Sequence, residues 1–600
     1  MPQYSVDNRT IDNVIGYIKD GQIAIPEIQR PFVWDSTKIR DLIDSLYRGF
    51  PVGYLIVWQN PNLKDKNGEV MIGKKIMIDG QQRVTAIMTA IVGIKVLDKD
   101  FKEKTHRIAF NPFAAEEEQC FEVQSAAIIK DKKWISDISV LFANDFNQYD
   151  FISDFCSKNP EMSPSVLSNR IQKVISIKNA PIGIIRLEPT LTIDDVTEIF
   201  IRINSKGKSL TQADFVMSTI AADEKNGGNI LRKTIDYFCR LANNHDFINQ
   251  IDKDAEFTSS PAYHLIKWVG TQHRHIYLPS FEDILRTAYM SNYYRAKLAS
   301  LTDLLHGRNF ETRTFEDAIM SDSFKNLTSG VNQVLDKYSL QQFNEAIMSA
   351  GFISKRLIKG RMPLNFAYTL FIRLRNDNSI DKLKVPHYVQ KWYVMSVLTE
   401  RYSSSPETKM DKDLRSIAER GFSRFYNETM ENLGETFWNV TIPQSLQTSS
   451  STSPVFYVYL AAQCKFNEDS FLGNGSKVRD LLESADIHHL FPRKYLQENG
   501  YDQVTQYNQV ANYVVLNKSV NIAIGMKAPN VYLKEIYEAC LEGKDSKYTM
   551  ISDIEDYNEN CRINCIPSDM KNMDYSHYET FLTERRKLMA QKIKTYFESL

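Results

Sequence analysis

Short apolar runs alternate with helical patterns over roughly the first 225 residues. The runs PVGYLIVWQ at 51–59 and KKIMIDG at 74–80 are nearly continuous, and each ends where polar residues take over. Runs of this length and content predict buried strands. LTIDDVTEIFIRIN at 191–204 has helical periodicity instead, and predicts a helix that leads into a glycine-containing loop. Strands and helices in this alternation favour an α/β domain at 1–225.

Helical spacing dominates from about residue 226 to 470, where strand patterns are few. SLQTSSSTSP at 445–454 is the clearest low-complexity stretch and predicts a loop. The remaining residues carry a pair of histidines and close with a long helical pattern at 579–600. We therefore expect an α+β multidomain protein, with a predominantly helical domain at 226–470 and a third domain at 471–600.

The composition is that of an ordinary globular protein. It has 600 residues, of which 43% are hydrophobic, and its 73 Lys and Arg nearly balance its 74 Asp and Glu. A chain with a net charge of −1 binds nucleic acid only through local basic patches. The N-terminus lacks a signal-peptide pattern, no apolar run is long enough for a membrane span, and the seven cysteines are scattered. These features predict a cytoplasmic protein with no membrane partner.

Two compact polar clusters interrupt the apolar N-terminal pattern. IPEIQRPFVW at 25–34 contains Gln29 and Arg30, and IDGQQRVTAI at 78–87 contains a second cluster. In the second, a glycine permits a tight turn into a helix, whose N-terminus would offer free N–H groups to a phosphate. Its arginine has the fork that grips phosphate oxygens, and its aspartate suits a Mg²⁺ ion or a nucleophile. The polar residues of the second cluster are Asp79, Gln81, Gln82 and Arg83.

A third cluster, FIRINSKGKSLTQADF at 200–215, has the composition of a loop that closes over an anion. It is not a phosphate-binding loop of the Walker type, because the required order of glycines and Gly-Lys-Ser/Thr is absent. Each cluster alone is equally compatible with a capped turn and a surface arginine. The anion-binding candidates in this cluster are Asn204, Lys206 and Lys208.

Together, IPEIQRPFVW, DGQQR and FIRINSKGKSL resemble the N-terminal domain of the GmrSD-type modification-dependent restriction proteins. That ParB-like domain is also found in the SspE and BrxU effectors of phage defence. The resemblance covers most of 1–225 and implies binding and hydrolysis of a nucleoside triphosphate, GTP or ATP, around DGQQR. It also implies that the region of the first motif senses a DNA modification.

The most specific pattern lies near the C-terminus. ADIHHLFPRKYL places His488 and His489 side by side at the end of an apolar run, and VANYVVLNKSVNIAIGMKAP follows with Asn512 and Asn521. Neighbouring side chains on a strand point to opposite faces, so one histidine can bind a cation while the other activates water. Few protein ligands plus water suit Mg²⁺ or Mn²⁺. The alternative is two strand-end histidines with unrelated asparagines.

This segment resembles the HNH, or ββα-metal, nuclease half of the same family. The resemblance implies that His488 and Asn521 bind the metal, that His489 is the general base and that Asn512 braces the loop and orients the base. The sequence departs from the family at Ala511, where glycine is usual, and in the long connection after the histidines.

Two further basic regions carry weaker expectations. The stretch 351–376 has several cations and no acidic residue, which favours either a phosphate-contacting face or a solvated helix. The closing helix carries acids as well as cations, which predicts a solvated face for Arg585, Arg586, Lys587, Lys592 and Lys594. The DNA-binding candidates of the first region are Lys355, Arg356, Lys359 and Arg361.

We therefore expect an NTP-regulated DNA endonuclease that acts on modified phage DNA in antiphage defence. The alternative is a nucleotide-hydrolysing DNA sensor or regulator whose nuclease is weak or inactive. A homodimer would favour double-strand breaks, since one HNH site cuts one strand at a time.

Overall fold

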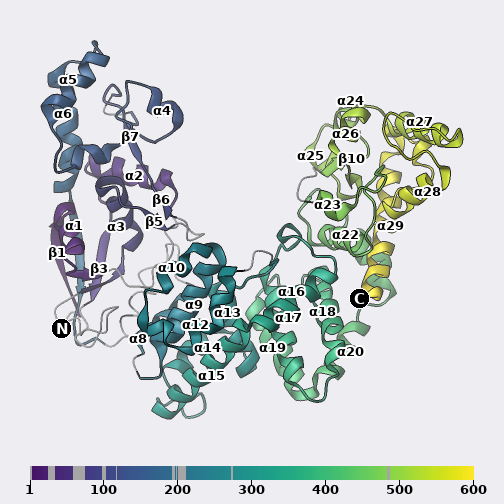
Figure 1. The fold of residues 1–600 in the computed structure, drawn as a ribbon, viewed down its shortest axis with the longest axis horizontal. Helices are drawn as coiled ribbons and strands as arrows, with labels where there is room; N and C mark the ends of the chain where they lie inside the picture. Colours follow the sequence, from purple (N-terminus) through teal and green to yellow (C-terminus); the bar gives the residue numbers. More distant parts are fainter. Residues whose placement is uncertain are drawn as a thin grey trace. The chain divides into compact units, whose positions relative to one another are not determined.

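The chain forms two compact units, Met1–Ser259 and Ser260–Leu600. Mixed strands and helices, with helices in the majority, confirm the expected α+β class. The unit boundary cuts the segment predicted as one domain at 226–470, and the predicted domain boundaries stay predictions. The computed structural model describes residues 3–24, 34–58, 75–97, 103–115, 118–191, 196, 199, 211–223, 225–271, 275–482 and 487–600 (Figure 1).

The first unit is built on a five-stranded sheet with the order β1-β9-β3-β4-β2. β9 pairs antiparallel with β1 and parallel with β3, and β4 pairs antiparallel with β3 and parallel with β2. Two of these strands confirm the apolar runs predicted as strands. The strands are β1 Tyr4–Thr10, β2 Ile23–Ala24, β3 Tyr54–Trp58, β4 Lys75–Asp79 and β9 Pro181–Leu187.

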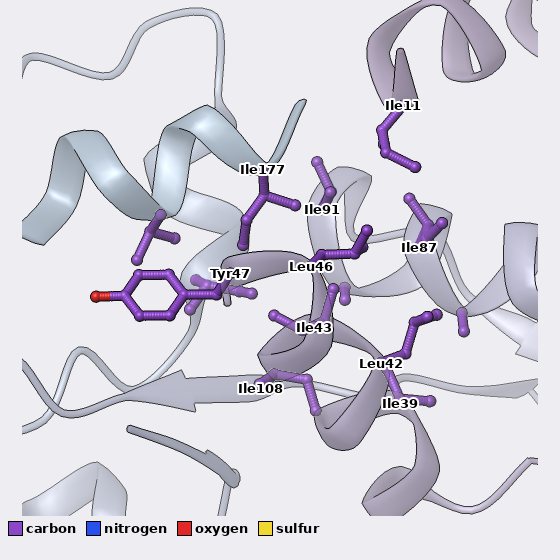
Figure 2. Packing of buried hydrophobic residues seen from close by; sticks show 14 of the residues in the cluster. Ile11, Ile39, Leu42, Ile43, Leu46, Tyr47, Ile87, Ile91, Ile108 and Ile177 are labelled. Carbon is purple, nitrogen blue, oxygen red and sulfur yellow. The ribbon is translucent and has the colours of Figure 1, made fainter. Parts of the chain in front are cut away.

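One face of this sheet is covered by helices whose apolar positions meet in a single core (Figure 2). α2, Ser36–Tyr47, begins at the N-cap Asp35 and turns Ile39, Ile43 and Leu46 toward the core, in keeping with the three- and four-residue spacing of a helix face. The first unit also contains α1 Ile11–Lys19, α3 Gln81–Ile87, β5 Val96–Leu97, β6 Glu103–Lys104, β7 Ile108–Phe110, β8 Phe121–Val123, α4 Ala126–Lys130, α5 Gln148–Lys158, α6 Pro164–Ile175, α8 Gln212–Ala222, α9 Gly228–Asn243, α10 Ile248–Ile251 and α11 Ala255–Thr258.

The second unit begins with helices, as the spacing from residue 260 to 470 predicts. The low-complexity stretch 445–454 lies in the connection between α21 and α22 and confirms the predicted loop. The helices are α12 Pro261–Ile266, α13 Phe281–Tyr293, α14 Leu298–Leu305, α15 Asp317–Leu335, α16 Lys337–Ser349, α17 Arg361–Asn376, α18 Val385–Leu398, α19 Pro406–Arg420, α20 Phe422–Glu431, α21 Ile442–Ser445, α22 Pro454–Lys465 and α23 Val478–Leu481.

The C-terminal part of this unit contains two paired strands, separated in sequence by α24 and α25, and then a helix. β10 and β11 form a two-stranded antiparallel sheet, and α26 follows β11 directly. The closing helix α29 confirms the predicted long helix. The elements are β10 Ile487–His489, α24 Arg493–Glu498, α25 Val504–Tyr507, β11 Tyr513–Val515, α26 Lys518–Ile524, α27 Pro529–Leu541, α28 Ile554–Ile563 and α29 Tyr578–Ser599.

The prediction that the cations of α29 lie on a solvated face is wrong for two of them. Arg585 is 0% exposed, and Lys592 forms an ion pair with Glu468 in which both side chains are nearly buried. A linear pattern of charges does not show which side of a helix faces the core. Across the described part of the chain, no helix combines the length and apolarity that a membrane crossing requires.

Candidate functional site

The two neighbouring histidines lie on β10, at its pairing with β11. His488 is opposite Val514 and His489 is opposite Tyr513. Because side chains alternate along a strand, the two imidazoles leave opposite faces of the hairpin. His488 is 9% exposed, and His489 is partly exposed. The hairpin therefore separates the two side chains, as two different chemical roles would require.

Asn508 fixes the orientation of the His489 ring. The Nε2 atom of His489 lies 2.8 Å from the Oδ1 atom of Asn508. Since Oδ1 is an acceptor, Nε2 carries the proton of the neutral ring, and Nδ1 keeps the lone pair. An edge-to-face contact with Tyr513, at 5.3 Å between ring centroids, also packs against the imidazole.

Burial is the main cause that lowers the pKa of His489, and the neighbouring His488 and Arg493 lower it further. The hydrogen bond to Asn508 raises this pKa and offsets part of the shift. The neutral imidazole therefore predominates near neutral pH. A neutral ring with one free lone pair is the form that accepts a proton from water.

Asn512 is fully buried and joins the two sides of the hairpin. Its Oδ1 accepts from the backbone N–H of Phe491 at 2.8 Å, and its Nδ2 donates to the carbonyls of Phe491 at 3.1 Å and Tyr507 at 3.2 Å. The backbone carbonyl of Asn512 also accepts from the N–H of Leu490 at 2.9 Å. These bonds hold the loop that follows His489 and give Asn512 the geometry of a bracing residue.

Asn521 lies on α26, one turn into the helix, and is partly exposed. Its side chain forms no hydrogen bond within the described part of the chain, so its amide oxygen is available to a cation. Asn517 occupies the N-cap position of α26, but its side chain donates to Ser476 Oγ at 3.1 Å instead of capping the helix.

The available donors fit a hydrated cation better than a structural metal. Among the described residues, no group of three or more His, Cys, Asp or Glu side chains could hold a metal ion. One imidazole and one amide oxygen, from His488 and Asn521, would leave most of the coordination shell to water and phosphate. Mg²⁺ and Mn²⁺ tolerate that arrangement because they keep much of their hydration.

Arg585 was expected on a solvated face, but it is buried and contacts the backbone around Asn512. Its Nη1 donates to the carbonyls of Ala511 at 2.8 Å and Tyr513 at 2.7 Å, on either side of Asn512. Its Nε donates to Cys565 and its Nη2 to Asn564, both at 3.3 Å. The buried guanidinium thus ties β11 to the end of α28.

At the N-terminal cluster, the predicted strand–turn–helix is present. β4 ends at Asp79, Gly80 turns with a φ of 97°, and α3 begins at Gln81. The left-handed φ and the packing of Leu55 against the α-carbon of Gly80 exclude a side chain at this position. Gln82 lies on the first turn of α3.

Arg83 is partly buried beside this turn. Its Nη1 donates to the carbonyl of Tyr54 at 2.7 Å, and its guanidinium lies against Gly53. Burial lowers the pKa of Arg83, and the charge of Asp79 opposes the shift. Gln81 donates to the carbonyl of Met77 at 3.1 Å. The turn therefore gathers Asp79, Gln81 and Arg83 at one end of β4.

The other two N-terminal clusters fall outside the described residues. This applies to Gln29 and Arg30 in the first cluster and to Asn204, Lys206 and Lys208 in the third.

The basic stretch at 351–376 divides into exposed and engaged cations. Lys355 is exposed, Arg356 donates to the carbonyl of Leu482 at 3.0 Å, and Lys359 lies 3.4 Å from Thr452 Oγ1. Arg361 instead bonds the buried Asp283 at 2.6 Å and the carbonyl of Leu278 at 2.7 Å. Two nitrogens of its guanidinium, Nε and Nη2, therefore bond groups at the start of α13.

Residues 11–221 match the N-terminal domain of the GmrSD restriction endonuclease. The match includes the strand–turn–helix with Asp79 and Arg83, and it supports the resemblance to GmrSD-type restriction endonucleases. An uncharacterized protein of Methanocaldococcus jannaschii is 21% identical over 579 residues, which cover 89% of this chain and 88% of that protein. This similarity extends beyond residues 11–221 and includes the segment that contains β10 and β11.

Proposed function

We propose that this chain is a metal-dependent DNA endonuclease of modification-dependent antiphage restriction, regulated by a nucleoside triphosphate. The observation that carries the proposal is the strand–strand–helix hairpin, in which Asn508 orients His489 and Asn512 braces the following loop. The GmrSD match at 11–221 supports the same class from the other end of the chain.

In the proposed reaction, Nδ1 of His489 removes a proton from the attacking water. Nε2 stays bonded to Asn508, so the ring keeps its orientation while it becomes an imidazolium, and the amide oxygen stabilises the new charge. His488 and Asn521 would hold Mg²⁺ or Mn²⁺, which when bound neutralises charge on the phosphate and on the leaving oxygen.

The DNA would approach across a basic face that borders the hairpin. Lys359 contacts Thr452, and the connection that contains Thr452 also contacts the hairpin, because Tyr513 donates to the carbonyl of Ser449 at 3.0 Å. Within the second unit, exposed cations thus lie next to the connection that packs on β11. Backbone phosphates are the natural partners of such cations. The proposed basic face consists of Lys355, Arg356 and Lys359.

We propose the turn at Gly80 as part of the site for GTP or ATP. Arg83 is prepositioned by its bond to Tyr54, and Asp79 is available to a magnesium-bound triphosphate. Regulation would follow if the nucleotide binds two conformations of the protein with different affinity.

The experiment that tests the proposal compares unmodified plasmid with modified phage DNA as substrates for the full-length protein. Each is incubated with Mg²⁺ or Mn²⁺, with and without GTP or ATP. We expect metal-dependent cleavage that differs between the two DNAs and changes with nucleotide. Intact nucleotide turnover with no cleavage of any substrate would favour a sensor whose nuclease is inactive.

Replacing Arg83 by alanine is expected to lower NTP turnover by about tenfold or more, because a charge-assisted bond to the triphosphate is lost. Phosphate release reports the turnover. Arg48→Ala is the matched control, since Arg48 also bonds a carbonyl, that of Glu118 at 2.8 Å, but at the C-cap of α2. Equal losses in both variants would assign Arg83 a purely structural role.

A further inference from the structure

Arg493 is a cation beside His489 to which the comparisons and the motif assign no role. It is the first residue of α24, follows Pro492, and is exposed. The chain that carries it is fixed, because Asn512 holds the backbone of Phe491 on both sides and Tyr532 donates to the carbonyl of Leu490 at 2.9 Å. The start of α24 is therefore a rigid point next to the hairpin.

The side chain of Arg493 is directed by an aromatic ring. Its guanidinium carbon lies 5.0 Å from the ring centroid of Tyr507, and that ring is 6.5 Å from the ring of His489 in an edge-to-face arrangement. Tyr507 precedes Asn508, the partner of His489. The cation and the imidazole thus both contact the ring of Tyr507.

No described residue forms an ion pair or a hydrogen bond with Arg493, and its ordering contact is the cation–π contact with Tyr507. This contact leaves the N–H groups at the edge of the guanidinium free, and that edge matches two oxygens of a phosphate. An unneutralised, oriented cation beside a general base suits an anionic substrate.

We propose that Arg493, held against Tyr507, binds a backbone phosphate of the DNA strand that enters the His489 site. This inference rests on the proposed nuclease function and adds a phosphate-binding residue to it. Because the contact between Arg493 and the phosphate forms when the DNA binds, its loss weakens DNA binding by the contribution of one phosphate contact.

The test measures binding of a fluorescein-labelled DNA duplex to full-length protein in Mg²⁺, with every variant in a His489→Ala background to prevent cleavage. Arg493→Gln is expected to bind about tenfold more weakly. The slope of log K against log salt is expected to become shallower by about 0.9, the share of one phosphate contact on duplex DNA. Arg493→Lys should keep most of the slope, because it keeps the charge.

Lys494→Gln is the matched control, since Lys494 is the next exposed cation on the same helix and points to a different side of it. An unchanged affinity and slope in Arg493→Gln, or an equal change in Lys494→Gln, would overturn the inference. Failure of the parent protein to bind or cleave DNA at all would instead overturn the proposed function. The two failures are thus distinguishable.

Discussion

His489→Ala is expected to lower the rate of DNA cleavage by about 10²- to 10⁴-fold, the usual contribution of a positioned general base. The imidazole is partly buried, its Nε2 is bonded to Asn508, and its Nδ1 is left to accept a proton. Alanine removes the base and leaves the bracing bonds of Asn512 intact. Single-turnover cleavage of a labelled duplex at saturating metal measures the effect directly.

Asn508→Ala gives the graded comparison for this variant. It keeps the imidazole but removes its orienting hydrogen bond, so we expect a smaller loss of rate than in His489→Ala. Both variants should retain the thermal stability of the wild type to within a few degrees. A wild-type rate in His489→Ala would show that this residue is not the base.

Arg585→Met is expected to lower the free energy of unfolding by about 2–4 kcal/mol. The change leaves buried carbonyls of Ala511, Tyr513, Asn564 and Cys565 without their donor, at about 1–3 kcal/mol for each group left unsatisfied. Relief from burying an unpaired charge offsets part of that cost, since burial lowers the pKa of Arg585. Urea unfolding of the full-length protein measures the change.

Lys587→Met is the matched control, because Lys587 lies on the same helix but is exposed, and we expect a change within about 0.5 kcal/mol. Arg585→Lys should fall between the two, since one ammonium cannot reach all four carbonyls. If Arg585→Met were as stable as Lys587→Met, the buried guanidinium would not hold β11 in place.

The local elements could be predicted because their causes lie within a few residues. The apolar run before Trp58 is a buried strand, and the glycine after Asp79 has the left-handed φ that a strand-to-helix turn requires. The neighbouring positions of His488 and His489 were enough to expect opposite faces of a strand, and they lie on one.

The contacts that complete the candidate site could not be predicted, because they join residues far apart in sequence. Asn508 meets His489 across a connection with no recognisable spacing, and only its position before Asn512 could have drawn attention to it. Arg585 was expected to be solvated because the closing helix carries acids as well as cations. Arg361 was expected to be available to DNA, but a buried aspartate of another helix engages it.

The most direct test of the central claim is nicking of supercoiled plasmid by the full-length protein in Mg²⁺ or Mn²⁺, in EDTA, and with His489→Ala prepared in parallel. If the hairpin is a metal-dependent nuclease site, the wild type nicks with the metal, not in EDTA, and the variant does not nick. Nicking that persists in EDTA or in the variant, or no cleavage of plasmid or phage DNA in either metal, would contradict it.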